Sequence, residues 1–159
     1  MVSVLFVCMG NICRSPVAKG VFESVVRREG LQDEILVDSA GTHVFYHAGE
    51  PPDPRAQESV HSRGIDISGQ QARLLDPEDC GRFDYILTMD EANYRMVSAL
   101  CRGSGVLRPF LDFAPGLETE VPDPYGGGAD GFVYVLHLVE EASEGLLADI
   151  RTRHLSPGL

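Results

Sequence analysis

One stretch decides the fold of this chain: Val4-Leu5-Phe6-Val7-Cys8-Met9-Gly10-Asn11-Ile12-Cys13-Arg14-Ser15-Pro16. It opens with apolar β-branched and aromatic residues, which predict a buried strand. It closes with Ser15 and Pro16, which predict the start of a helix, with the serine as N-cap and the proline at the first helical position. A short loop from Cys8 to Arg14 therefore joins a strand to a helix.

The loop from Cys8 to Arg14 has the properties of an anion-binding site. A loop that leads from a strand into a helix N-terminus directs backbone N–H groups at one point and adds the positive end of the helix dipole. Gly10 lets the backbone approach a ligand closely, and the guanidinium of Arg14 matches two phosphate oxygens. The predicted backbone donors are the amides of Met9, Gly10, Asn11, Ile12, Cys13 and Arg14.

Cys8 begins this loop, where the same positive field favours its thiolate. A thiolate beside a bound phosphate is placed to attack phosphorus. The alternative is that Cys8 is a small buried hydrophobic residue at the end of a strand.

Composition limits the remaining possibilities. The 159 residues are the size of one domain, so we expect a single domain over residues 1–159. A formal net charge of -11 argues against binding to nucleic acid, which needs a basic surface. No apolar run approaches the roughly 20 residues of a membrane span, and the N-terminus has no features of a signal peptide. We therefore expect a cytoplasmic protein without nucleic-acid or membrane partners. We also expect a monomer, although the composition itself does not determine the oligomeric state.

The four cysteines and five histidines do not form a metal-binding pattern. No two cysteines have the C-x2-C spacing of a zinc site, and the histidines are dispersed. We expect no metal and no cofactor. We also expect no structural disulfide, because disulfides are rare in the cytosol.

Strand and helix patterns alternate along the chain, which predicts parallel strands joined by helices. Strands are expected over residues 2–7, 35–40, 85–88 and 105–108, and helices over 16–29, 53–63, 90–100 and 130–153, with a short helix after Asp76-Pro77. The fold class is α/β, a four-stranded parallel sheet with helices on both faces. Ligands bind such sheets at the carboxyl ends of the strands, where the loop after Cys8 would lie.

The run from Cys8 to Pro16 resembles the phosphate-binding loop of the low-molecular-weight protein tyrosine phosphatases. Other segments match the family in the same order: Asp38-Ser39-Ala40-Gly41-Thr42, Pro51-Pro52-Asp53-Pro54-Arg55, Thr88-Met89-Asp90 and Asp123-Pro124-Tyr125. The resemblance implies a flavodoxin-like fold. It also implies hydrolysis of phosphotyrosine proteins or small aryl phosphates through a cysteinyl-phosphate, with inorganic phosphate as the product.

The resemblance also implies catalytic roles. Cys8 would be the nucleophile, and Arg14 would bind the phosphate. The Ser15 hydroxyl would hydrogen-bond the Cys8 sulfur and stabilise it as a leaving group. Asp123 would protonate the leaving phenolate and later act as base for water. An Asp-Pro pair is usually only a turn, but Asp123 lies within a loop, whereas the Asp-Pro pairs at 53 and 76 precede helical patterns and are typical N-caps.

An aryl phosphate needs a pocket with flat, apolar walls. Tyr125 is one candidate, and Tyr46 is a second, with Phe45 as the alternative from the same loop. These aromatic residues could instead pack only locally. A deep pocket with Cys8 at its floor would favour phosphotyrosine over the shorter phosphoserine.

Asn11 and Ser39 are expected to support the loop by hydrogen bonds, with Asn11 holding a left-handed turn. By resemblance, Cys13 could form a reversible disulfide with Cys8; Cys13 could equally be only a buried residue. Two positions depart from the family pattern. Gly126 replaces a second aromatic residue, and Gln70 stands where some members have a histidine of the supporting network.

Two alternatives remain open. An arsenate reductase of the same fold would use Cys8 and Arg14, but it would need two further cysteines about seven residues apart, and Leu87 stands seven residues after Cys80. A non-catalytic phosphotyrosine-binding module would have no need for a nucleophile, an arginine and an acid together.

Overall fold

The computed structural model describes residues 1–102 and 106–155. Its centre is one parallel sheet with the strand order β2-β1-β3-β4. The strands are β1 (Val2–Cys8), β2 (Ile35–Gly41), β3 (Tyr85–Thr88) and β4 (Val106–Pro109). The helices are α1 (Arg14–Arg28), α2 (Pro54–His61), α3 (Asp79–Arg82), α4 (Glu91–Leu100) and α5 (Ala129–Arg153), with 3-10 turns η1 (Phe45–His47) and η2 (Phe110–Phe113). The predicted α/β class and the four parallel strands are confirmed. The predicted start of the last strand at residue 105 lies outside the described residues.

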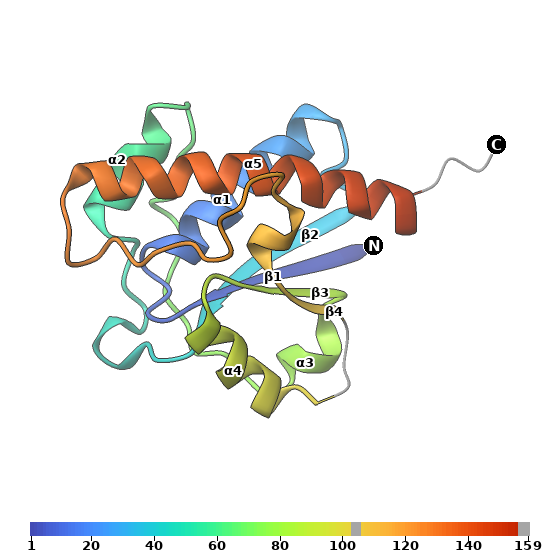
Figure 1. Ribbon diagram of the computed structural model, residues 1–159, viewed down its shortest axis with the longest axis horizontal. Coiled ribbons are helices and arrows are strands. Elements are labelled where there is room, and N and C mark those ends of the chain that lie inside the picture. Colours follow the sequence, from blue (N-terminus) through green and yellow to red (C-terminus); the bar gives the residue numbers. More distant parts are fainter. Residues whose placement is uncertain (103–105, 156–159) are drawn as a thin grey trace.

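The apolar run in β1 is fully buried because the sheet is covered on both faces. Val4 and Phe6 pack in the larger core with α1 and α5, whereas Leu5 and Val7 pack in a smaller core with residues of α3 and α4. Figure 1 shows α1 and α5 on one side of the sheet and α3 and α4 on the other. A strand with both faces covered has no polar face, which is why this stretch shows no alternation of apolar and polar residues.

Helix α1 begins earlier than the sequence predicts. Arg14 is its first residue and Cys13 its N-cap, so Ser15 and Pro16 lie inside the first turn. The prediction of Ser15 as N-cap is wrong, because its hydroxyl is bonded within the loop instead. Pro16 is tolerated inside the helix because N–H groups of the first turn have no partner within the helix.

Of the two other Asp-Pro pairs, Asp53 is an N-cap as predicted, whereas the prediction for Asp76 is wrong because Glu78 is the N-cap of α3. The Asp53 carboxylate accepts a hydrogen bond from the backbone N–H of Arg55 at 2.8 Å and caps α2. Asp76 accepts from the N–H of Glu78 at 2.8 Å, in a turn that comes just before α3. Along the described residues, no helix is long and apolar enough to cross a membrane.

The expectation of no structural disulfide is wrong, because Cys80 and Cys101 are bonded to each other. Cys80 lies in α3 and Cys101 is the C-cap of α4, and both belong to the smaller core beneath the sheet. The packing of the two helices brings the cysteines together across 21 positions of sequence, which their spacing does not indicate.

We expect reduction of this disulfide to lower the free energy of unfolding by about 3 kcal/mol, because the cross-link restricts the unfolded chain. Urea unfolding of the wild type with and without a thiol reductant measures the difference. The double variant Cys80→Ala/Cys101→Ala, which keeps Cys8 and Cys13, should not respond to the reductant. A wild type whose unfolding is equally insensitive would contradict a structural role for this bond.

Candidate active site

A pocket of about 270 Å³ opens at the carboxyl end of β1, as expected for a parallel sheet. Its walls come from the phosphate loop (residues 8–14), the segment 43–47 and the segment around Asp123. The lining residues are Cys8, Met9, Gly10, Ile12, Cys13, Arg14, His43, Val44, Phe45, Tyr46, His47, Asp123 and Tyr125. The fold thus brings together three segments that are far apart in sequence.

The Cys8 sulfur lies within a chain of buried polar contacts. Its Sγ is 3.0 Å from the Oγ of Ser15. The side-chain amide of Asn11 donates to Ser15 Oγ at 2.8 Å and to Ser39 Oγ at 3.0 Å. All four residues are buried. The expected contacts of Asn11, Ser15 and Ser39 are therefore present in the structure.

Asn11 shapes the phosphate loop through its backbone as well as its side chain. Its φ of 58° is left-handed, as expected, and asparagine tolerates this conformation better than most residues. Its side-chain oxygen accepts a hydrogen bond from the backbone N–H of Arg73 at 2.9 Å. Gln70 stands where some family members have a histidine of the supporting network. Its side chain donates to the carbonyl of Pro16 at 3.0 Å, so this bond supports the first turn of α1 and not Asn11.

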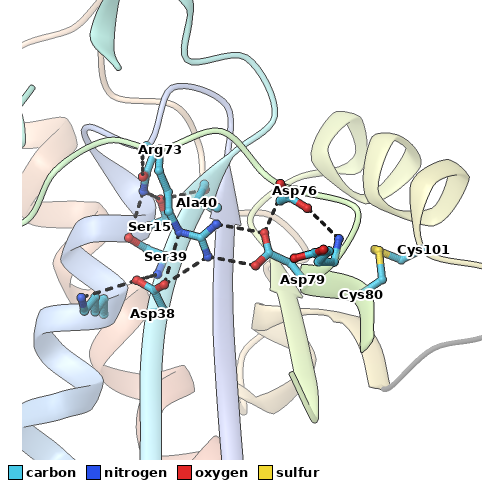
Figure 2. A network of polar contacts seen from close by, with 12 residues as sticks. Ser15, Asp38, Ser39, Ala40, Arg73, Asp76, Asp79, Cys80 and Cys101 are labelled. Atoms are coloured by element: carbon cyan, nitrogen blue, oxygen red, sulfur yellow. Dashed lines mark hydrogen bonds and ion pairs between the residues drawn. A yellow bond between two sulfur atoms is a disulfide. The ribbon is translucent and has the colours of Figure 1, made fainter. Parts of the chain in front are cut away.

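Arg73 itself is fixed by two carboxylates, as Figure 2 shows. Its guanidinium pairs with Asp38 at 3.1 Å and with Asp79 at 2.9 Å. Asp79 is fully buried, and its neighbour in sequence is the disulfide-bonded Cys80. The support of the phosphate loop therefore extends to the helix α3 on the other side of the sheet.

The backbone of the phosphate loop offers donors for an anion. Within the described chain, the N–H groups of residues 9–13 have no backbone acceptor. The carbonyls of this loop are used elsewhere, since Met9 accepts from His43 at 2.8 Å and Ile12 from Asp53 at 2.8 Å. Gly41 at the end of β2 lies so close that a Cβ there would be 2.6 Å from the carbonyl oxygen of Met9.

Arg14 is buried at the base of the pocket. Its guanidinium donates to the carboxylate of Asp90 at 2.6 Å and to the carbonyl of Val121 at 3.0 Å. Burial opposes its charge, but the nearby Cys8 and the hydrogen bond that Arg14 donates to Asp90 together raise the pKa of Arg14. The side chain is thus a fixed cation at the point where the backbone donors converge.

Asp123 lines the same pocket as Cys8. Its carboxylate is 3.9 Å from the second terminal nitrogen of Arg14, and about half of its side chain is exposed. Its other oxygen accepts a hydrogen bond from the N–H of Tyr125 at 3.1 Å. Asp123 therefore reaches the pocket from a loop, not from the start of a helix.

Both aromatic candidates of the segment 43–47 line the pocket, so Tyr46 and Phe45 need not be alternatives. Each ring is largely exposed. The ring of Tyr125 on the facing wall contacts His47 edge to face, with ring centres 6.3 Å apart. His47 was not among the predicted wall residues.

Cys13 carries a free thiol, like Cys8. Burial, with the negative charge of Asp53 as a second cause, raises the pKa of the Cys13 thiol to about 12. Cys13 is therefore a neutral thiol near pH 7.

Sequence reasoning missed the roles of Asp90 and Arg73. Asp90 follows the buried strand β3 and caps α4 in a capping box with Asn93. A polar residue directly after a buried parallel strand indicates the edge of the sheet where ligands bind, so this role could have been predicted. No pattern in the sequence indicates that Arg73 supports the phosphate loop, because its contribution is a backbone N–H.

Comparison with known proteins shows the family of this chain. The family model for low molecular weight phosphotyrosine protein phosphatase matches residues 3–155. A putative low molecular weight protein-tyrosine-phosphatase of Synechocystis is 42% identical over 151 residues, which are 92% of this chain and 95% of the relative.

Solved structures give the same result. A protein tyrosine phosphatase from Entamoeba histolytica has a TM-score of 0.91 and 37% identity, covering 96% of this chain and 98% of that one. DARP, a Drosophila arginine phosphatase, has a TM-score of 0.86 and 29% identity, covering 94% of this chain and 98% of that one. The chain belongs to the low molecular weight phosphotyrosine protein phosphatase family.

Proposed function

We propose that the chain hydrolyses phosphotyrosine in proteins, and small aryl phosphates, in two steps. In the first step, the thiolate of Cys8 attacks phosphorus and forms a P–S bond. The bond from phosphorus to the phenolic oxygen breaks, and Asp123 transfers its proton to that oxygen. The N–H groups of residues 9–14 and the Arg14 guanidinium stabilise the charge on the phosphoryl oxygens.

In the second step, water attacks phosphorus, and the Asp123 carboxylate takes its proton. The P–S bond breaks, inorganic phosphate leaves, and Cys8 is again a thiolate. The Ser15 hydroxyl, 3.0 Å from Sγ, stabilises the departing sulfur by a hydrogen bond. No cofactor or metal takes part in either step as proposed.

One observation carries the proposal: one pocket is lined by Cys8, Arg14 and Asp123, and the Asp123 carboxylate is 3.9 Å from the Arg14 guanidinium. A nucleophile, a phosphate-binding group and an acid are the groups that in-line displacement at phosphorus requires. A module that only binds phosphotyrosine would not require all three.

We propose phosphotyrosine as the preferred side chain because of the walls above Cys8. Phe45, Tyr46 and Tyr125 line the pocket with aromatic rings, and the lining holds one carboxylate, that of Asp123. Arginine phosphatases occur among the structural relatives, so phosphoarginine is the comparison substrate.

Domain organisation, oligomeric state and cellular location are proposed as well. We propose that residues 1–159 work as one domain, as a monomer in the cytoplasm. The Cys80–Cys101 disulfide is unusual for a reducing compartment, so the oxidation state of this pair in cells tests the location. Reversible bonding of Cys8 to Cys13 stays a prediction.

The roles of Cys8 and Asp123 are tested by hydrolysis of para-nitrophenyl phosphate and phenyl phosphate between pH 4 and 8. We expect Cys8→Ser to be inactive. Asp123→Asn should lose about 10²- to 10⁴-fold in kcat/KM on phenyl phosphate, whose leaving group needs the proton, and less on the nitrophenyl ester. Asp33→Asn, an exposed carboxylate far from the pocket lining, is the control.

An active Cys8→Ser variant would refute the cysteinyl-phosphate. A wild type that is inactive on both esters, but that consumes a thiol reductant in the presence of arsenate, would instead favour the arsenate reductase.

Substrate choice is tested with peptides that differ only in one residue, phosphotyrosine or phosphoserine, and with phosphoarginine. We expect kcat/KM to be at least about 100-fold higher for phosphotyrosine than for phosphoserine, because the phosphate of the shorter side chain does not reach Cys8. It should also be higher than for phosphoarginine, because the pocket lining offers a guanidinium no carboxylate besides that of Asp123. Tyr46→Ala and Phe45→Ala should each raise KM about 5- to 10-fold, the value of one aromatic contact. Equal kcat/KM values for phosphotyrosine and phosphoarginine would contradict this preference.

A further inference from the structure

The acid loop (residues 122–128) carries Asp123, and all of its residues except Pro124 are exposed. It precedes α5 and passes beside α2, in orange in Figure 1. The backbone N–H of Gly131, in the first turn of α5, donates to the carbonyl of Gly128 at 3.2 Å. The side-chain hydrogen bonds that reach the loop from another part of the described chain both come from Arg55 of α2, which donates to the carbonyl of Tyr125 at 2.9 Å and to that of Gly127 at 2.8 Å. Arg55 is therefore the one side chain outside the loop that donates hydrogen bonds to its backbone in the described chain.

Arg55 is itself held in a fixed orientation. Its guanidinium makes two hydrogen bonds to the Asp53 carboxylate, at 3.0 and 2.9 Å. It also lies over the rings of Phe132 at 4.7 Å and Tyr125 at 5.7 Å. The hydrogen bond from Arg55 lowers the pKa of Asp53, so this carboxylate stays charged and the pair stays intact near neutral pH. A planar group with this many contacts loses little freedom when it binds the loop.

Asp53 connects this arrangement to the phosphate loop. Its backbone N–H donates to the carbonyl of Ile12 at 2.8 Å. A continuous path therefore runs from the phosphate loop through Asp53 and Arg55 to the carbonyl of Tyr125. The N–H of the same Tyr125 donates to the Asp123 carboxylate. The Asp53–Arg55 ion pair therefore links the phosphate loop to the acid loop. Asp53 is bonded to the backbone of the phosphate loop, and Arg55 is bonded to the backbone of the acid loop.

We propose that Arg55 is a positioning residue, which holds the carboxyl group of Asp123 at the leaving-group oxygen by binding the backbone of the acid loop. The inference rests on the proposed function, since it concerns the acid of that reaction. Arg55 makes no contact with the Cys8 sulfur and is absent from the pocket lining. Its effect should therefore appear in proton transfer to the leaving group and not in phosphate binding.

The competing interpretation is that Arg55 only stabilises the packing of α2 against α5. The chain offers a matched control for this. Arg63 follows α2 and pairs with Glu140 of α5 at 3.0 Å, but it has no contact with the acid loop. Replacement of Arg63 removes an arginine–glutamate ion pair between the end of α2 and α5, and it leaves the hydrogen bonds of the acid loop in place.

The experiment measures kcat/KM for aryl phosphates whose leaving phenols span a wide range of acidity, from para-nitrophenol to phenol. The variants are Arg55→Met, which keeps the length of the side chain but removes its donors, Arg55→Lys, which keeps one donor group, and Arg63→Met. We expect Arg55→Met to lose about 10- to 100-fold on phenyl phosphate and less than about 3-fold on para-nitrophenyl phosphate. Arg55→Lys should be intermediate, Arg63→Met unchanged, and the inhibition constant for inorganic phosphate the same in all.

The double variant Arg55→Met/Asp123→Asn decides between the two interpretations. If Arg55 acts through Asp123, this variant should be no slower on phenyl phosphate than Asp123→Asn alone. Additive losses, an equal loss on all esters, or no loss in Arg55→Met would overturn the proposal. Should Arg55→Met fail to fold, the same comparison with Arg55→Lys gives the answer. If Asp123→Asn itself shows no dependence on the leaving group, the acid of the proposed function is wrong, which is a separate result.

Discussion

A short loop can surround an anion only if its backbone N–H groups turn inward while its carbonyls bond elsewhere. Here the carbonyls of Met9 and Ile12 accept from His43 and Asp53, and Asn11 takes the left-handed conformation that reverses the chain. Such a backbone is not stable by itself, because it lacks the internal hydrogen bonds of a helix or sheet. Much of the surrounding structure serves to hold it: β1 ends in it, α1 begins in it, and the strand β2 closes against it at a glycine.

The same constraint explains how a protein with a formal net charge of -11 can bind a phosphate. Surface carboxylates act over distances at which salt screens them, whereas loop amides and a buried guanidinium act at contact distance. Three carboxylates near the site are neutralised by ion pairs: Asp90 pairs with Arg14, and Asp38 and Asp79 pair with Arg73. Local geometry therefore outweighs the overall charge.

The sequence predicted what adjacent residues determine. The apolar run in β1, the passage from strand to helix and the Asp53 cap all depend on neighbours in the chain, and all three appear in the structure. Helix α1 begins two residues earlier than predicted, because the Ser15 hydroxyl is bonded to Cys8 and Asn11 and does not cap the helix. Helix propensities do not describe this competition between capping and contacts within the loop. The Cys80–Cys101 bond and the support from Arg73 could not be predicted, because they arise only when helices on the far side of the sheet pack together.

The two halves of the site differ in how they are built, and the entry of the substrate accounts for the difference. The nucleophile belongs to the core, where Cys8, Asn11 and Ser15 are almost inaccessible to solvent. The acid must lie on the open side, since the leaving group and the attached protein approach from there. The acid loop buries only Pro124, so burial of apolar side chains does little to fix its other residues. Hydrogen bonds from one oriented arginine to its backbone can fix it without closing the pocket, and they leave the exposed side chains of the loop free to meet the substrate.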